Sequence, residues 1–361
     1  MRCRLAQRDD EAHLRRILAG HAMPGAIRTA YEREPDFHRA LEVMGTFQQT
    51  LVAEEDGELL GLGIRALRPV LVNGRPMQLG YLGGLRTLAR ARGGPALARG
   101  FRLLRELHGD GRTPAYLSTI LEANLPVRAL LTSARAPLPH YLDLGRFSTY
   151  ALLAGRRSPV RPAGGLRVEP GSAALLPEIL AFLQARQGSL QFAPDLSSGL
   201  EPAGFYRDFS PGDFRLARRD GRLVGVIGVW DQSAFRQTRI TGYAPWLGLL
   251  RPGLNLLATA LGVPGLPAPG RTLGEAYLAF RGIEGDDPAV LVALVQAVLA
   301  ERPGRILLVA LHERDPLRPA LRAFRRIPYH ARLYCVCWED GLPFYNGLDP
   351  RRVPTLELAR L

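Results

Sequence analysis

The sequence contains no lysine, so all 47 of its Lys and Arg positions are arginines. Asparagine is also scarce and occurs only at Asn73, Asn124, Asn255 and Asn346. Arginine, alanine, glycine, proline and leucine dominate instead. This pattern indicates a biased codon pool, so part of the net charge of +13 needs no functional explanation. A basic surface still favours anionic partners: a phosphorylated cofactor, an acidic substrate or a nucleic acid.

Cysteine is nearly absent, with Cys3, Cys335 and Cys337 as the three thiols of a 361-residue chain. The last two alternate within an apolar run at residues 333–338, and alternation along a strand places both side chains on one face. Two thiols without further cysteine or histidine nearby do not make a zinc site, and the histidines are scattered. We therefore expect a buried strand here. The sparse, odd cysteine count favours a reducing, cytoplasmic compartment.

No apolar signal sequence opens the chain, and no uninterrupted apolar run is long enough to cross a membrane. The most apolar stretch, residues 246–263, is interrupted by Arg251, Pro252 and Gly253. We predict a core or lid helix there and no membrane partner. Hydrophobic residues make up 47% of the chain, which excludes an intrinsically disordered protein.

Two segments, residues 53–61 and 217–225, share the pattern Ala-x-x-Asp-Gly-x-Leu-x-Gly. Asp-Gly between alternating apolar runs predicts a β-hairpin, because glycine accepts the positive φ of a tight turn. A matching helical spacing of apolar residues precedes each hairpin: Leu14, Ile17 and Leu18, then Leu176, Ile179 and Leu180. Further landmarks follow in the same order in both halves. The sequence therefore predicts two copies of one domain in tandem.

The domain boundaries follow from this repeat. We place the first domain at residues 1–154, the second at 166–345 and a C-terminal tail at 346–361. Residues 155–165 are rich in proline, glycine and arginine and lack apolar periodicity, which predicts a linker. The second copy carries an insertion at residues 246–270. Each copy is expected to be an α/β domain, a mixed and largely antiparallel sheet flanked by helices.

An arginine- and glycine-rich turn separates a predicted strand, residues 79–87, from an amphipathic helix. One face of that helix is formed by Leu97, Phe101, Leu104 and Leu107. Pro95 suits the first helical turn, where its missing N–H costs nothing. Free amides and the positive end of a helix dipole bind phosphate well, and Arg90 and Arg92 add charge. A purely structural turn is the alternative.

The order of elements and this turn resemble the GCN5-related N-acetyltransferase superfamily, in two copies that cover nearly the whole chain. The layout also resembles a bacterial subgroup of tandem acetyltransferases. The superfamily pattern is Gln/Arg-x-x-Gly-x-Gly/Ala, whose amides hold the pyrophosphate of acetyl-CoA. Here Arg90 and Gly93 match, whereas Pro95 at the sixth position has no N–H. The resemblance implies these cofactor-binding residues: Leu85, Arg86, Thr87, Arg90, Arg92, Gly93, Gly94 and Ala96.

The resemblance implies an N-acetyltransferase that takes acetyl-CoA as donor and an amine in a small molecule or a peptide as acceptor. In the second copy the corresponding turn follows Arg281 but places Glu284, Asp286 and Asp287 at the helix start. Carboxylates there cap the helix themselves and repel a pyrophosphate. We therefore assign the active site to the first copy. The second copy is then structural or forms a wall of the substrate site.

The implied reaction is direct attack of an amine on the thioester. Backbone amides near Leu85 to Thr87 fit the role of donors to the oxyanion. The adjacent glycines Gly83 and Gly84 mark either a β-bulge or a close approach of ligand.

Three residues carry the predicted catalytic chemistry: Glu122, Asn124 and Tyr141. Glu122 is the candidate general base, with a solvated surface carboxylate as the alternative. Asn124 either hydrogen-bonds the cofactor or a water, or it caps a helix. Tyr141 would protonate the leaving thiolate, as the superfamily's tyrosine does, although its spacing from Asn124 is longer than in the family. Ser133 is the fallback.

Other functions stay open. The polar and aromatic run WDQSAFRQ, residues 230–237, either lines a pocket or forms a strand edge with a loop. A non-catalytic protein that binds acyl-CoA or a partner protein is the alternative function, motivated by Pro95 and by the lack of an obvious base. Nucleic acid is not expected, because arginine is spread along the chain and no known binding module appears. The fold alone does not name the acyl acceptor.

Overall fold

The structure is a computed structural model that describes residues 1–361 except 24, 92–94 and 154–164. The strands of the first half are β1 (Arg2–Leu5), β2 (Ile27–Glu32), β3 (Phe47–Glu55), β4 (Glu58–Val72), β5 (Arg75–Thr87), β6 (Tyr116–Leu121) and β7 (His140–Leu153). Those of the second half are β8 (Leu166–Pro170), β9 (Ala193–Pro194), β10 (Phe214–Arg219), β11 (Arg222–Trp230), β12 (Gln237–Tyr243), β13 (Glu275–Ile283), β14 (Ile306–His312) and β15 (Arg326–Cys337). The α-helices are α1 (Glu11–Ala19), α2 (Phe37–Leu41), α3 (Ala96–His108), α4 (Leu125–Leu131), α5 (Leu176–Gln187), α6 (Pro245–Leu261), α7 (Pro288–Glu301) and α8 (Leu342–Asn346).

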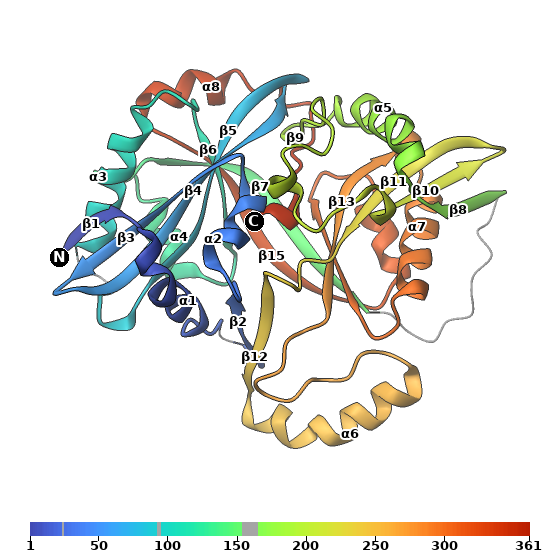
Figure 1. Ribbon diagram of the computed structural model, residues 1–361, viewed down its shortest axis with the longest axis horizontal. Coiled ribbons are helices and arrows are strands. Elements are labelled where there is room, and N and C mark those ends of the chain that lie inside the picture. Colours follow the sequence, from blue (N-terminus) through green and yellow to red (C-terminus); the bar gives the residue numbers. More distant parts are fainter. Residues whose placement is uncertain (24, 92–94, 154–164) are drawn as a thin grey trace.

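One 13-stranded sheet runs through the described part of the chain, from β1 at one edge to β8 at the other (Figure 1). The strand order is β1-β3-β4-β5-β6-β15-β7-β14-β13-β11-β10-β8, with β9 added on β4. The pairs β5–β6 and β13–β14 are parallel, and the other neighbours are antiparallel. The predicted fold class, a mixed and largely antiparallel sheet flanked by helices, is confirmed.

The two halves exchange strands at the centre of this sheet. Strand β7, the last of the first half, lies between β14 and β15 of the second half. Strand β15 in turn lies between β6 and β7 of the first half. Each half therefore satisfies the backbone hydrogen bonds of its inner strands with a strand from the other half.

The two repeated Asp-Gly sequences form the predicted hairpins. Asp56 and Gly57, with φ of 51° and 78°, join β3 to β4. Asp220 and Gly221, with φ of 53° and 79°, join β10 to β11. Positive φ at both central residues is the turn geometry whose twist matches that of the flanking strands, and Asp-Gly adopts it readily.

The insertion in the second half begins earlier than predicted. In the first half a turn at Asn73 and Gly74 joins β4 directly to β5. In the second half residues 231–274 stand between β11 and β13. They include β12, which pairs with β2 of the first half in a separate two-stranded ribbon, and then α6. The predicted insertion at 246–270 covers only the later part of this segment.

Helices cover both faces of the sheet in the first half. Helices α1 and α2 pack on one face, where Leu14 and Phe37 join a core with Leu117 of β6. Helices α3 and α4 cover the other face, where Phe101 and Leu104 of α3 are buried. The apolar face predicted for residues 97–107 is therefore the face that packs.

Helices α7 and α5 cover the sheet in the second half. Val290 and Leu294 of α7 pack in one core, and Leu183 of α5 packs in another. The α5 core also contains Ala40 and Val43, from α2 and the turn after it. Helices α2 and α5 therefore lie on the same face of the sheet and border one shared core.

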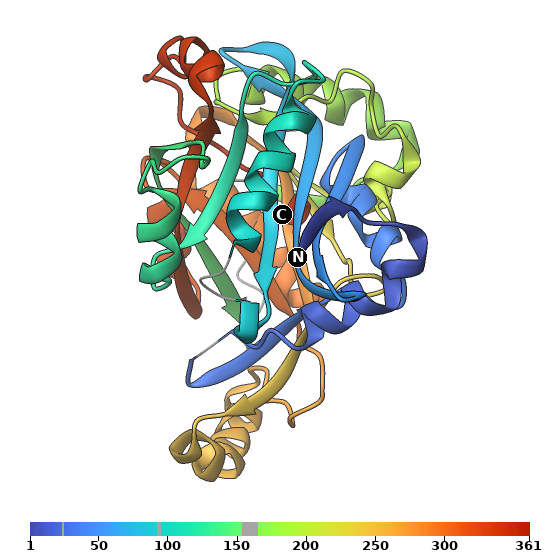
Figure 2. The same ribbon diagram turned by 90° about the vertical axis from the view of Figure 1, so that its left-hand side faces the viewer.

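Helix α6 stands apart from the body of the molecule at the end of the β2–β12 ribbon, and Figure 2 shows it projecting beyond the sheet. Its inner side is tied to the following loop, because Arg251 and Asn255 donate to the Leu266 carbonyl (3.3 and 3.0 Å). Its outer side exposes Trp246, Leu249, Leu250, Leu254, Leu256, Leu257 and Leu261. It is therefore not a core helix. Among the described residues, no helix is long and apolar enough to cross a membrane.

The two clustered cysteines lie where the alternation predicts. Cys335 and Cys337 of β15 are both fully buried, in the core beneath α1 and α2. Both are free thiols, as is Cys3. Within the described residues, no group of three or more His, Cys, Asp or Glu side chains is arranged to hold a metal ion.

Candidate functional site

Two parallel strand pairs diverge, one in each half of the molecule. Strands β5 and β6 pair over three residues, the last being Leu82 with Ser118. Strands β13 and β14 also pair over three residues, the last being Tyr277 with Leu308. In both pairs the strands continue beyond this point, so each half has a gap between two diverging strands.

A β-bulge lies beside the gap of the first half. The register of β5 against β4 shifts between Gly83 and Arg86. Gly84 has a φ of 66°, a left-handed conformation that glycine adopts without steric cost. A Cβ atom at this position would lie 2.5 Å from Cδ1 of Ile64, so a larger residue has no room. The bulge interpretation of the two glycines is therefore correct.

The second half repeats this bulge without a glycine. The register of β13 against β11 shifts between Ala279 and Gly282. Phe280 takes the left-handed φ (49°), which is a strained conformation for a bulky side chain. Its N–H donates to Oε2 of Glu357 at 2.9 Å. A carboxylate from the C-terminal segment thus lies against the bulge amide of the second half.

The C-terminal segment lies across the gap of the second half and borders a small cavity there. Residues 355–358 line the same space as residues 278–281 of β13 and residues 310–311 of β14. Phe280 and Leu311 are only 1% and 3% exposed there. Burial raises the pKa of Glu357. The C-terminal segment therefore forms one wall of a small cavity in this gap.

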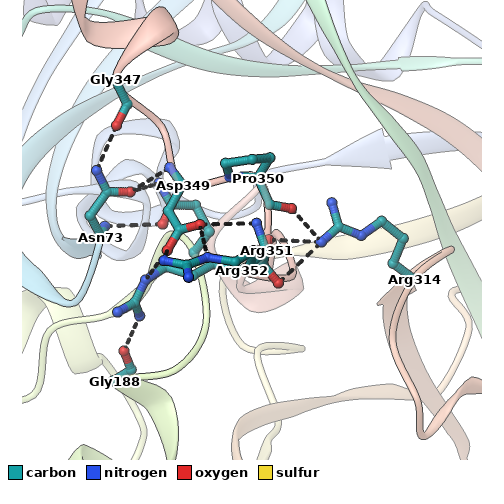
Figure 3. Close-up of polar contacts among 9 residues, drawn as sticks. Asn73, Gly188, Arg314, Gly347, Asp349, Pro350, Arg351 and Arg352 are labelled. Carbon is teal, nitrogen blue, oxygen red and sulfur yellow. Dashed lines mark hydrogen bonds and ion pairs between the residues drawn. The ribbon is translucent and has the colours of Figure 1, made fainter.

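Polar contacts anchor the chain that leads into this segment (Figure 3). Asn73 donates through Nδ2 to the Gly347 carbonyl (2.8 Å), and its Oδ1 accepts from the Asp349 N–H (2.9 Å). Arg314 donates to the Pro350 carbonyl at 2.7 Å. Asn73 belongs to the β4–β5 turn and Arg314 follows β14, so the C-terminal segment is fixed to both halves.

The gap of the first half has no such plug among the described residues. Leu85 of β5 is 39% exposed and Leu121 of β6 is 38% exposed. Leu125, at the start of α4, is 64% exposed. Apolar side chains thus stand open to solvent around this gap, whereas the C-terminal segment lies across the matching gap of the second half.

The predicted phosphate-binding turn lies only partly within the described residues. Three of its predicted members fall outside them: Arg92, Gly93 and Gly94. Arg90 lies in a short 3-10 turn and forms an exposed ion pair with Glu58. Ala96 is the first residue of α3, and Pro95 is its N-cap. The roles of these residues in cofactor binding stay predictions.

The other predicted cofactor residues, Leu85, Arg86 and Thr87, end strand β5 just after the bulge. Thr87 pairs with Gly61 of β4. Arg86 is half-buried, and burial lowers the pKa of its guanidinium. These residues therefore border the open gap, and their contacts with a cofactor stay predictions.

Glu122 follows β6 at the open gap and is held by arginines. Its Oε1 accepts from Arg146 Nε at 2.8 Å, and Arg332 lies 4.0 Å away. The hydrogen bond from Arg146 lowers the pKa of Glu122, which makes this carboxylate a weak proton acceptor. Backbone pairing also relates Glu122 of the first half to Glu313 of the second half. The Glu122 N–H donates to the His330 carbonyl (2.9 Å), as the Glu313 N–H donates to the Arg146 carbonyl (2.8 Å).

Asn124 and Tyr141 lie at different places on the molecule. Asn124 is exposed at the N-cap position of α4, and its side chain makes no capping hydrogen bond. Tyr141 pairs with Val336 of β15, whereas Glu122 bonds to His330 of the same strand. Six residues of strand span about 20 Å. The structure therefore brings Glu122 and Asn124 together and leaves Tyr141 far from both.

A polar cluster that the repeat did not reveal lies on the face that α2 and α5 share. Tyr81 of β5 hydrogen-bonds Thr119 of β6 (3.0 Å) just where the gap begins. Tyr31 of β2 accepts from Arg236 Nε (2.5 Å). The Arg236 guanidinium also lies over the ring of Tyr277, 5.5 Å from its centre. Arg236 belongs to the polar and aromatic run at residues 230–237. That run is the one sequence feature that indicated a polar site in this region.

A buried acid of this cluster belongs to β13. Glu275 is 6% exposed and accepts from Oγ1 of Thr238 at 2.7 Å. Burial raises its pKa, with Thr238 and Arg236 opposing the shift. The cluster therefore joins side chains of β2, β5, β6 and β13 with the inserted segment of the second half.

No protein-family model and no curated protein matches this sequence. Solved structures do share its fold. A GCN5-related glucosamine N-acetyltransferase region of a fungal multi-domain GH3 β-N-acetylglucosaminidase has a TM-score of 0.60 at 11% identity, and the match covers 92% of this chain and 38% of that chain. A GCN5-related N-acetyltransferase from Sphaerobacter thermophilus has a TM-score of 0.57 at 12% identity, covering 99% and 98%.

A third similar structure is the N-myristoyltransferase of Saccharomyces cerevisiae, with a TM-score of 0.57 at 11% identity, covering 92% of this chain and 82% of that chain. This chain thus spans only 38% of the fungal protein but nearly the whole Sphaerobacter protein. The match to the Sphaerobacter protein covers both halves of this chain, including β7 and β15. The chain therefore has the fold of the GCN5-related N-acetyltransferase superfamily.

Proposed function

We propose that this protein is an acyl-CoA-dependent N-acyltransferase, that its donor is acetyl-CoA and that its active site lies in the first half. The open gap between β5 and β6, with a bulge beside it, carries this proposal. In the second half, residues 355–358 lie across the equivalent gap and leave a small cavity beside them. A protein with this fold, the yeast N-myristoyltransferase, is known with bound myristoyl-CoA, which supports an acyl-CoA ligand.

The bulge of β5 offers a donor to the thioester oxygen. Gly84 and Phe280 are equivalent, since each holds the left-handed φ of its bulge. The Phe280 N–H binds a carboxylate oxygen of Glu357. The same amide at Gly84 is suited to the negative charge that develops on the thioester oxygen during attack. This donor lies one residue before the predicted stretch Leu85 to Thr87.

In the proposed reaction the acceptor nitrogen, once deprotonated, attacks the thioester carbon. The new C–N bond forms, the C–S bond breaks and CoA leaves as the thiolate, which then takes up a proton. Glu122 and Asn124 stay the proposed proton acceptor and the proposed cofactor- or water-binding residue, because both follow β6 beside the gap. Tyr141 would have to act from about 20 Å away, so we do not propose it as a partner of Glu122.

Acetyl-CoA titration of the full-length protein tests this function. A ligand that binds only the native state raises its stability, so we expect the melting temperature to rise with acetyl-CoA concentration. A panel of amines, followed by release of free CoA, then measures transfer. No stabilisation at millimolar acetyl-CoA would exclude the proposal. Stabilisation without transfer to any amine would favour the non-catalytic acyl-CoA-binding protein.

A further inference from the structure

Arg33, which directly follows β2, is a buried cation without a compensating anion. It is 3% exposed, and its Nη2 donates to the thioether sulfur of Met44 at 3.0 Å. Its Nε and Nη1 have no hydrogen-bond partner. Among the described residues Arg33 forms no ion pair with any carboxylate. Its guanidinium carbon also lies 5.2 Å from the centre of the Phe37 ring. An unpaired guanidinium in the interior is strongly unfavourable, and the two free donors of Arg33 are available to an anion.

Glu32 and Glu34, the chain neighbours of Arg33, pair with Arg239 and Arg15 instead. Burial, together with the like charges of Arg236 and Arg86, lowers the pKa of Arg33 to about 9. Arg86 also forms no ion pair within the described part of the chain; its Nη1 donates to the Leu85 carbonyl (2.9 Å). A cation surrounded by cations gains more from a bound anion than a paired one does.

Arg236 is satisfied mainly by neutral acceptors. It donates to the Tyr31 hydroxyl, to Oε1 of Gln232 (2.7 Å), to the Ala359 carbonyl (2.6 Å) and to the main-chain oxygen of Leu361. The carboxylate that acts on it is Glu275. We call the following set the arginine cluster: Tyr31, Arg33, Tyr81, Arg86, Arg236 and Glu275. It holds three guanidinium groups against one buried carboxylate.

The arginine cluster borders the open gap of the first half. Arg86 lies on β5 directly after the bulge, and Tyr81 hydrogen-bonds Thr119 where β5 and β6 begin to diverge. The other residues of the arginine cluster lie on the face of the sheet that α2 and α5 cover. A molecule bound to these arginines would therefore lie beside the position proposed for the thioester.

We propose that the arginine cluster binds a carboxylate of the acyl acceptor, so that the acceptor is a primary amine that also carries a carboxylate, as an amino acid does. This inference rests on the proposed function. Arg33 and Arg86 would supply charge-assisted and bidentate hydrogen bonds to the carboxylate. The amino group, a few bonds away, would then reach the thioester carbon next to Gly84. An amine without the carboxylate leaves the guanidinium groups unpaired and adds a like charge.

Matched pairs of amines test this assignment on the full-length protein at saturating acetyl-CoA. Each pair joins an amino acid with the amine that lacks its carboxylate: phenylalanine with phenethylamine, and leucine with isoamylamine. We expect kcat/KM to be higher for the amino acid by about tenfold to a hundredfold, the range of a charge-assisted hydrogen bond. Equal or faster transfer to the carboxylate-free amine would overturn this inference and leave the proposed function intact.

The substitution Arg33→Met separates a binding role from a structural one. Methionine keeps an unbranched apolar stem and removes the unpaired charge, so the melting temperature of the ligand-free protein should rise or stay unchanged. The KM for phenylalanine should rise about tenfold or more, while kcat/KM for phenethylamine should not fall, because the substitution removes a like charge. Arg75→Met, at an exposed position of β5, is the matched control and should change neither. A lower melting temperature with an unchanged KM would overturn the inference.

A binding measurement distinguishes failure of this inference from failure of the proposed function. N-acetylphenylalanine keeps the carboxylate after transfer, and calorimetry can measure its binding with and without CoA. Binding to the wild-type protein that Arg33→Met weakens would support the arginine cluster even without turnover. If acetyl-CoA binds but neither this acid nor any amino acid does, the inference alone is overturned. If acetyl-CoA does not bind, the proposed function fails and this titration still decides the anion site.

Discussion

Arg65 shows how this chain buries an arginine whose charge is compensated. It is fully buried, and its Nη1 and Nη2 donate to the two carboxylate oxygens of Asp110 at 2.8 and 2.7 Å. Its Nε donates to the Tyr116 hydroxyl at 3.0 Å. Arg33 is buried to nearly the same degree and has none of these bonds to a carboxylate. This contrast between two interior arginines is the residue-scale reason to expect an anion at Arg33.

The Arg65–Asp110 pair gives a stability prediction. Asp110→Asn leaves the buried guanidinium without its carboxylate. We expect a loss of about 2–3 kcal/mol, less than the usual cost of breaking a buried pair because Asp110 is 28% exposed. Urea unfolding at neutral pH measures this loss.

The pH dependence of that loss has a definite sign. The hydrogen bond from Arg65 lowers the pKa of Asp110 in the folded protein. A carboxyl group with a lowered folded pKa stabilises the protein above its unfolded pKa, and that contribution disappears as pH falls through the folded pKa. The difference in unfolding free energy between the wild-type protein and Asp110→Asn should therefore be largest at neutral pH and shrink progressively below about pH 4. A stability difference that persists unchanged at lower pH would contradict this interpretation.

Local rules predict some of these residues and miss others. The Asp-Gly turns, the buried Cys335 and Cys337 and the bulge at Gly84 each follow from a preference of one or two neighbouring residues. Arg33 and Arg236 are far apart in the chain, and neither stands in a pattern that distinguishes it from other arginines. Their meeting is a property of the folded chain alone, so sequence reasoning had no signal for the arginine cluster beyond the run at 230–237.

At the scale of elements, α6 turns its apolar side outward. Leu249 and Leu256 are 85% and 75% exposed, whereas Leu247 is 8% exposed and packs against the β12 residues Ile240 and Tyr243. Apolar periodicity predicts a helix but does not say what covers each side of it. Of the two expected alternatives, a core or a lid helix, the core helix is therefore wrong, and the lid stays a prediction.

Substitutions on the two sides of α6 should differ in their effect on its local stability. Leu247→Ala removes a buried side chain and should lower the free energy of opening of α6 by about 2–4 kcal/mol. Leu249→Ala, on the exposed side, should change it by less than about 0.5 kcal/mol. Hydrogen exchange of the α6 amides measures both values without requiring global unfolding. A comparable loss in Leu249→Ala would show that the outer side is covered in solution.

The C-terminal segment is another element whose place the sequence did not reveal. Residues 346–361 have no helical or alternating apolar pattern, so only a tail was predicted. In the structure Glu357 accepts from the bulge amide of Phe280, and residues 355–358 line the adjacent gap. A segment held by single side chains and by backbone bonds leaves no periodic signal in its sequence.

At the scale of the whole molecule, the repeat correctly indicated the same order of elements in both halves. It did not predict that β7 and β15 change places between them. Both strands are apolar enough to pair with either neighbour, and strand order is decided by the long-range packing of the complete chain. The boundaries predicted at 154 and 166 therefore divide the sequence into two halves, but one continuous sheet contains strands from both halves.

Strand exchange predicts that the halves stay together when the chain is cut between them. A protease site inserted at residues 155–164 would allow cleavage of the folded protein. We expect the two fragments to co-elute on gel filtration and to unfold in one transition, because β7 and β15 are each hydrogen-bonded to the other half. The same fragments should separate in denaturant. Separation under native conditions would contradict the exchanged arrangement.

Calorimetric titration of acetyl-CoA into the full-length protein tests most directly the claim that the donor site is the open gap of the first half. We predict one molecule bound per chain, and loss of binding in Gly84→Val, because a Cβ at this residue meets Ile64 and strains the bulge. Gly221→Val is the matched control, since Gly221 also has a positive φ (79°) but lies in open space. It should bind like the wild-type protein. Two molecules per chain, or undiminished binding in Gly84→Val, would contradict the assignment.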